Sequence, residues 1–149
     1  MLALIATLAG TYHLTQDKIR RLLSEVIGIT FSLGAISQAQ GKIAHALQHS
    51  VTELKNAVAQ VPVRHVHETS HSHHAQTYWV WAMATEQACY FTILPTRGQY
   101  GAEDLLGGQP SGIVVSDRYA SYNFIPVAHR QVCWAHLLRH FALRWNGLP

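Results

Sequence analysis

One acidic residue stands where α/β proteins place their sites. Asp117 ends the run GIVVSD (112–117), whose apolar residues are typical of a buried strand. Ligands of α/β sheets bind at the carboxyl ends of strands, and a carboxylate there can hold a divalent metal through hard oxygen ligands. A second interpretation stays open, because aspartate is also a favoured helix N-cap and a helical turn is expected to start at Arg118.

A second candidate is the C-x-x-H element formed by Cys133 and His136. Such a pair can supply two ligands of a zinc site, but zinc needs four, and the sequence has no second pair at zinc spacing. The alternative is a cysteine in the core and a histidine at the start of a helix.

A third candidate is the histidine-rich run HVHETSHSHH (65–74). In a strand, His65 and His67 project to the same face, where two imidazoles can bind a transition metal. His71, His73 and His74 fall where we expect a loop. A histidine-based metal-binding module is therefore one possible function, without further support from the sequence.

The residues from 62 onward alternate strand-like and helical runs, and they must position these side chains. The run YWVWAMAT (78–85) is apolar on both faces, as in a central strand. The predicted elements are strands at 63–69, 78–85 and 89–94, a helix at 99–106, a strand at 112–117, a helical turn at 119–124, a strand at 131–134 and a helix at 136–145. This β-β-β-α-β-α-β-α order predicts an α/β fold with a partial RNase H-like mixed sheet.

Residues 1–61 are predicted to be helical, so we expect two domains, 1–61 and 62–149. A short helix covers 2–9, and a second begins after the N-cap Thr15 and ends at Gly28, with an apolar face that includes Val26. A third runs from the cap Ser32 to about residue 60. Its near-heptad apolar spacing predicts packing along another helix.

Composition limits the class of protein. Hydrophobic residues make up 48 % of the 149 residues and charged residues 13 %, which favours a folded core over disorder. A net charge of +3 is compatible with nucleic-acid binding but does not establish it. The two cysteines form no CxxC pair, and no run approaches the roughly 18 apolar residues of a membrane span. We therefore expect a cytoplasmic protein without a membrane partner.

Four segments together resemble the insertion-sequence transposases of the IS66 type. These are ITFSLGAIS (29–37), TSHSHHAQTYWVWAMAT (69–85), IVVSDRYASYN (113–123) and RQVCWAHLLRHF (130–141). The resemblance implies an RNase H-like core in which two aspartates and one glutamate hold two Mg²⁺ (or Mn²⁺) ions. It also implies DNA as partner, because such enzymes cut donor DNA and join its ends to a target.

The resemblance also assigns roles to individual residues. Asp117 matches the family's second acidic position and would bind metal, and Cys133 and His136 match a C-x-x-H element beside the active site. The helical region matches a segment of helix-turn-helix character. Its basic residues would then contact DNA phosphates, unless the helices only pack on the core: Lys18, Arg20, Arg21 and Lys42.

The sequence departs from the family at two of the three acidic positions. The family's first aspartate belongs to an Asp-Glu-Thr run, and here His67 precedes Glu68 and Thr69. Glu68 should not replace the lost carboxylate, because neighbouring strand residues point to opposite faces. No Asp or Glu follows Asp117. We therefore expect a family member truncated at both ends and catalytically incomplete alone, or a non-enzymatic DNA-binding remnant. Self-association stays open.

Overall fold

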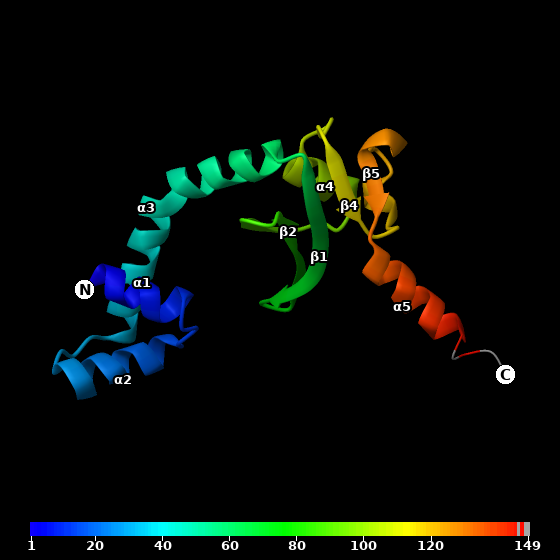
Figure 1. The fold of residues 1–149 in the computed structure, drawn as a ribbon. Coiled ribbons are helices and arrows are strands. Elements are labelled where there is room, and N and C mark those ends of the chain that lie inside the picture. The colour runs from blue at the N-terminus through cyan, green and yellow to red at the C-terminus, as the bar shows by residue number, and fades with distance from the viewer. Residues whose placement is uncertain (146, 148–149) are drawn as a thin grey trace. The chain divides into compact units, whose positions relative to one another are not determined.

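The computed structural model describes residues 1–145 and 147. Figure 1 shows helices in the first part of the chain and a five-stranded sheet with further helices after it. The elements are α1 (Leu2–Gly10), α2 (Gln16–Ile27), α3 (Leu33–Gln60), β1 (Val63–His73), β2 (Gln76–Ala84), β3 (Cys89–Leu94), α4 (Gln99–Leu106), β4 (Ile113–Ser116), the 3₁₀ turns η1 (Ala120–Tyr122) and η2 (Val127–His129), β5 (Arg130–Val132) and α5 (Trp134–Trp145).

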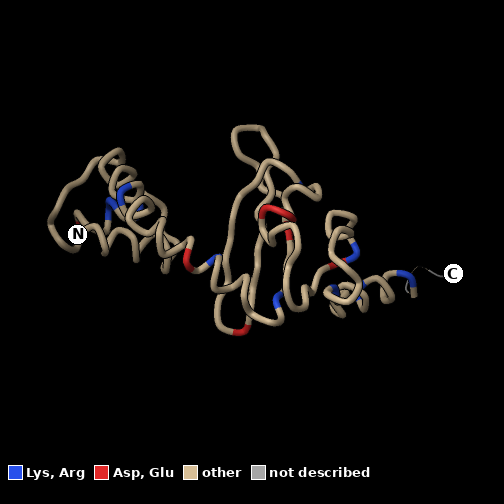
Figure 2. The backbone as a smooth tube through the Cα atoms, turned by 90° about the horizontal axis from the view of Figure 1, so that it is seen from above, with Lys and Arg blue, Asp and Glu red and all other residues tan. Residues whose placement is uncertain are grey.

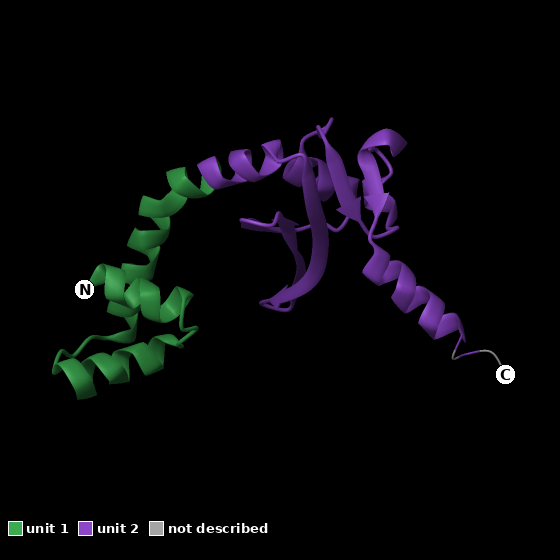
Figure 3. Ribbon diagram, in the orientation of Figure 1, with its two compact units in different colours: residues 1–52 green, residues 53–149 purple. Residues whose placement is uncertain are grey.

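The chain forms two compact units, residues 1–52 and 53–149, drawn in different colours in Figure 3. The division lies within α3, because the last turns of this helix contribute Val58 to the core of the second unit. The predicted boundary at residue 62 instead marks the place where helix gives way to strand.

Unit 1 is built from α1, α2 and the first part of α3. Thr15 caps α2 by accepting a hydrogen bond from the backbone N–H of Lys18, and Gly28 ends it in the left-handed conformation with φ 75°, as predicted. The prediction that Val26 belongs to the apolar face is wrong, since it is 76 % exposed. The buried face is narrower and centres on Ile19 and Leu23.

The long helix α3 begins and ends as predicted, with the Ser32 hydroxyl accepting a hydrogen bond from the N–H of Ala35. The prediction that it packs along another helix is wrong for its middle. Leu47 is 51 % exposed and Val51 is 44 % exposed. Only positions near the two ends are buried, because each end packs into a different unit.

The sheet of unit 2 has the strand order β3-β2-β1-β4-β5. The first three strands are antiparallel neighbours, and β4 and β5 lie parallel to β1. The predicted α/β class with a mixed sheet is confirmed. The expected helical element between β4 and β5 consists of two short 3₁₀ turns, because Pro126 follows η1 closely and disfavours a continuous helix.

The first hairpin is longer than predicted. β1 pairs with β2 up to His73↔Gln76, and His74 and Ala75 form the tight turn with positive φ. The prediction that His71 and His73 lie in a loop is therefore wrong. Their polar side chains do not show the apolar pattern of a strand, although the backbone pairing of β1 with β2 continues up to the turn.

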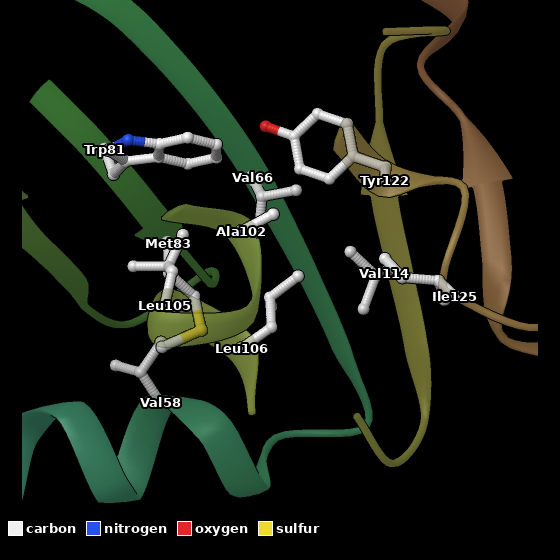
Figure 4. Close-up of a cluster of buried hydrophobic side chains, with 10 residues drawn as sticks. All are labelled: Val58, Val66, Trp81, Met83, Ala102, Leu105, Leu106, Val114, Tyr122 and Ile125. Atoms are coloured by element: carbon white, nitrogen blue, oxygen red, sulfur yellow. The ribbon is translucent and has the colours of Figure 1, made fainter. Parts of the chain in front are cut away.

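The core of unit 2 lies between the sheet, α4 and η1. Trp81 and Met83 of β2 meet Leu105 of α4 and Val58 of α3, and Tyr122 of η1 packs edge-on against Trp81 (Figure 4). The indole N–H of Trp81 donates to the carbonyl of Thr96 at 3.0 Å, so this large side chain has its polar atom paired.

The closest packing in this core predicts a specific destabilisation. A Cβ on Gly101 of α4 would lie 2.7 Å from Cζ2 of Trp81. Gly101→Ala should gain up to about 1 kcal/mol in helix propensity but lose more to overpacking, for a net loss of about 1–2 kcal/mol. Urea unfolding measures this free energy. Gly108→Ala, where a Cβ meets nothing within 4 Å, is the matched control and should unfold like the parent.

Candidate functional site

The candidate site lies at the end of β4, beside the central strand β1. The parallel pairs run from Val63↔Ile113 to His65↔Val115. Asp117 directly follows β4, and this register, if continued by two residues, would place it opposite His67. The residue at the predicted metal position and the residue that departs from the family motif therefore share one edge of the sheet.

The half-buried Asp117 shapes the loop that carries it. Its Oδ1 accepts a hydrogen bond from the backbone N–H of Tyr119 at 2.9 Å. This is an Asx turn, whereas the N-cap of η1 is Tyr119, which makes no side-chain cap bond. Asp117 is thus not the N-cap of a helix but has a related local role. Among the described residues, its Oδ2 has no hydrogen-bond partner.

The C-x-x-H element brings a second imidazole to this edge. The N–H of Cys133 donates to the carbonyl of Ser116 at 2.7 Å, so the chain leaves the sheet there and Trp134 begins α5. The predicted strand 131–134 is consequently shifted to Arg130–Val132. His136, in the first turn of α5, lies with its ring centroid 5.6 Å from that of His67. Its Nδ1 is buried without a hydrogen-bond partner.

A cavity of about 490 Å³ opens next to these side chains. Asp117 and His136 line this cavity. The loop after Asp117 contributes Arg118 and Tyr119, and α5 contributes further residues of its first turns. The volume falls within the range of about 300–1,000 Å³ typical of ligand sites.

Glu68 points to the opposite face of β1. Burial alternates along this strand, with Val66 and Glu68 buried and His65 and His67 exposed. The carboxylate of Glu68 accepts a hydrogen bond from Arg97 Nε at 3.0 Å and one from the Tyr122 hydroxyl. It therefore serves the core and does not take the place of the missing carboxylate.

Two arginines hold the Asp117 loop from either side. The guanidinium of Arg97, bound to Glu68, stacks 3.9 Å from the ring centroid of Tyr119. Arg130 Nη2 donates to the carbonyl of Asp117 at 3.0 Å, and its Nη1 donates to Asn123 Oδ1 at 2.9 Å. Sequence reasoning missed both residues, since nothing local marks arginines whose partners lie far along the chain.

Tyr122 stays a hydrogen-bond donor in this network. Burial, followed by the hydrogen bond to Glu68 and its negative charge, raises the pKa of the hydroxyl far above its ordinary value. A protonated hydroxyl is what a buried carboxylate needs as a partner.

The donor set at the site does not fit Mg²⁺ or Mn²⁺ as the family would require. These hard ions prefer several convergent oxygen ligands, and here one carboxylate stands beside two imidazoles. Across residues 1–145 and 147, no three His, Cys, Asp or Glu side chains are grouped so as to hold a metal ion.

The basic residues predicted to contact DNA in unit 1 lie on or near exposed surfaces. Arg20 pairs with Asp17 at 2.7 Å and Arg21 with Glu25 at 3.4 Å. The positive charge of each arginine is thus partly offset by an acidic residue of the same helix. The exposed Lys18 and Lys42 complete the predicted set, whose role stays a prediction.

Removal of the hydroxyl oxygen of Tyr122 tests the hydrogen-bond network that joins Tyr122, Glu68 and Arg97. Tyr122→Phe should lower the free energy of unfolding by about 1–3 kcal/mol, because it leaves a buried oxygen of Glu68 without its donor. Chemical denaturation measures the loss. Tyr100→Phe removes the same atom from a side chain that is 69 % exposed and should change stability by less than about 0.5 kcal/mol. Equal effects at both positions would contradict the network.

Comparison with known proteins places the chain in a family. The searches of curated proteins and of solved structures found no significant match. No helix among the described residues is long and apolar enough to span a bilayer. The model of the family described as Transposase IS66 family matches residues 1–145, which is nearly the whole chain and includes Asp117, Cys133 and His136. The chain belongs to the IS66 transposase family.

Proposed function

We propose that this chain takes part in transposition as a DNA-binding member of its family, and that residues 1–149 do not catalyse strand transfer by themselves. The observation that carries the proposal is the composition of the sheet edge, where Asp117 has His67 and His136 as neighbours in place of further carboxylates.

The electrostatics of this edge argue against metal-dependent catalysis. Two divalent ions bring four positive charges, and one carboxylate offsets only a small part of them. An imidazole adds no negative charge and suits softer metals. Glu68 does not supply a further metal ligand at this edge, because it lies on the other face of β1 and is paired with Arg97.

Three features support an RNase H-like core, DNA as partner and a cytoplasmic location. The antiparallel hairpins followed by parallel strands, in the order β3-β2-β1-β4-β5, match the arrangement that the family resemblance implies. Family membership implies DNA as the substrate. The free thiols of Cys89 and Cys133 suit the reducing cytoplasm where DNA lies.

The histidine-based metal module finds less support. His65 and His67 do share the exposed face of β1, as predicted for a strand. Within the described part of the chain no third ligand joins them in a metal-binding group.

A strand-transfer assay tests the catalytic part of the proposal. Purified residues 1–149, incubated with DNA carrying the element's ends and with Mg²⁺ or Mn²⁺, should yield no joined product, because the ion cage is incomplete. A full-length, active member of the family serves as positive control in the same buffer. Robust joining by the 149-residue chain would overturn the proposal.

Metal titration tests the missing carboxylate directly. The parent chain should show no saturable Mn²⁺ binding by electron paramagnetic resonance. His67→Asp should bind Mn²⁺ measurably, with an affinity about tenfold or more above the detection limit for the parent, because it adds a second carboxylate near His136 and the cavity that Asp117 lines. His65→Asp is the matched control, since it adds the same charge on the same face beside Val115. Saturable binding by the parent that Asp117→Asn abolishes would be the contrary result.

A further inference from the structure

We propose that the surface beside Asp117 binds the phosphodiester backbone of DNA, with Arg118 and Arg139 as its principal contacts. The inference rests on the proposed function in one respect, namely that DNA is the partner. It assigns to this chain an anion site at the sheet edge where its family resemblance predicts a cation site.

The cavity next to Asp117 shares lining residues with a second one. The first measures about 490 Å³ and the second about 120 Å³, and both are lined by Arg118, Leu137 and His140. The first adds Arg139 and His136, and the second adds Arg144. The two cavities thus share part of their lining between the loop after β4 and one side of α5, and we call the surface that they cover together the depression.

The charge of this region has one sign after Asp117. Residues 118–149 contain four arginines and no aspartate or glutamate. Figure 2 shows blue segments, which mark Lys and Arg, in the helical part that leads to the C-terminus. The preceding part of unit 2, residues 53–117, contains six acidic and three basic residues. The mild positive charge of unit 2 is thus concentrated on the segment that forms the depression.

The guanidiniums in the depression are available to a ligand. Arg130 is bound to the Asp117 loop, and Arg97 to Glu68. For the exposed Arg118 and Arg139, by contrast, the described structure gives no hydrogen bond or ion pair. A planar guanidinium with free donors binds phosphate oxygens in bidentate fashion, and such charge-assisted bonds are among the strongest available.

Asp117 is the one anion in the depression and opposes phosphate binding. Its Oδ1 is engaged by the N–H of Tyr119, which offsets part of the charge. Two free arginines outweigh one such carboxylate, and Arg144 extends the positive surface away from it. Asp117 should therefore set where along the depression the phosphates lie without preventing their binding.

The shape of the depression favours a polymer over a single phosphate. His136, Arg139, His140 and Arg144 follow each other at helical spacing on one side of α5. From His136 to Arg144 the helix rises by about 12 Å, a length over which one strand of a duplex presents three to four phosphates, at about 3.4 Å of rise along the duplex axis for each. Two arginines interleaved with two imidazoles over this length match a strand, whereas a free phosphate would meet only part of the row.

Fluorescence anisotropy with a labelled duplex of the element's end tests the site. Arg118→Gln/Arg139→Gln should weaken binding by about tenfold or more at 100 mM salt and reduce the slope of log K against log salt by about two. Lys55→Gln is the control, because it removes a charge of the same unit that is bound to Asp104. It should weaken binding by less than about threefold. Both substituted arginines are exposed, so the variants should keep the parent's melting temperature.

The outcomes separate the two proposals. Absence of salt-dependent DNA binding by the parent would overturn the proposed function itself. Binding by the parent that the double arginine variant retains at the level of Lys55→Gln would overturn the site alone. Inorganic phosphate should displace DNA no better than chloride of equal ionic strength. Displacement well beyond that would contradict the assignment to an extended backbone in favour of a single-phosphate site.

Discussion

The parallel pairing of β1 with β4 is the contact on which the rest of unit 2 depends. It joins the antiparallel hairpins to the β4–β5 half of the sheet and fixes which residue stands beside Asp117. Because strand side chains alternate between faces, the same register sends Glu68 into the core and leaves His67 outside. A slip of one residue would exchange the two, burying an imidazole against Arg97 and losing the network beneath the site.

This division explains how the fold can tolerate a histidine at position 67, where the family resemblance implies an aspartate. His67 is exposed, so the side chain at this position contributes little to stability. Glu68 is buried and carries two charge-assisted bonds that hold Arg97 and Tyr122 in place. Exchange of the exposed residue therefore alters chemistry and leaves the scaffold intact, whereas exchange of its neighbour would disturb the scaffold first. The geometry of the Asp117 loop is preserved by residues that need no metal.

The sequence predicted the elements better than the contacts between them. Caps at Thr15 and Ser32 defined the helix starts, because capping is a local interaction. Periodicity failed where burial depended on distant partners, as for Val26 and for the polar end of β1. The position of Asp117 after a buried strand could be predicted from the sequence. The neighbours of Asp117 could not be predicted, because the contact of His136 with His67 depends on the sheet register and on the hydrogen bond of Cys133 that ends β5.

The sign of the local charge decides how DNA can approach the sheet edge. An edge with several carboxylates repels the phosphate backbone until bound cations reverse its charge. On the proposal made above, Arg118 and Arg139, which have no ionic partner among the described residues, would attract phosphate to this edge without any bound ion. The scarcity of carboxylates that makes the site unsuitable for two Mg²⁺ ions would therefore also favour the approach of DNA to these arginines. It follows that association of this chain with DNA should need no divalent metal, which separates its binding from the chemistry of catalytically complete relatives.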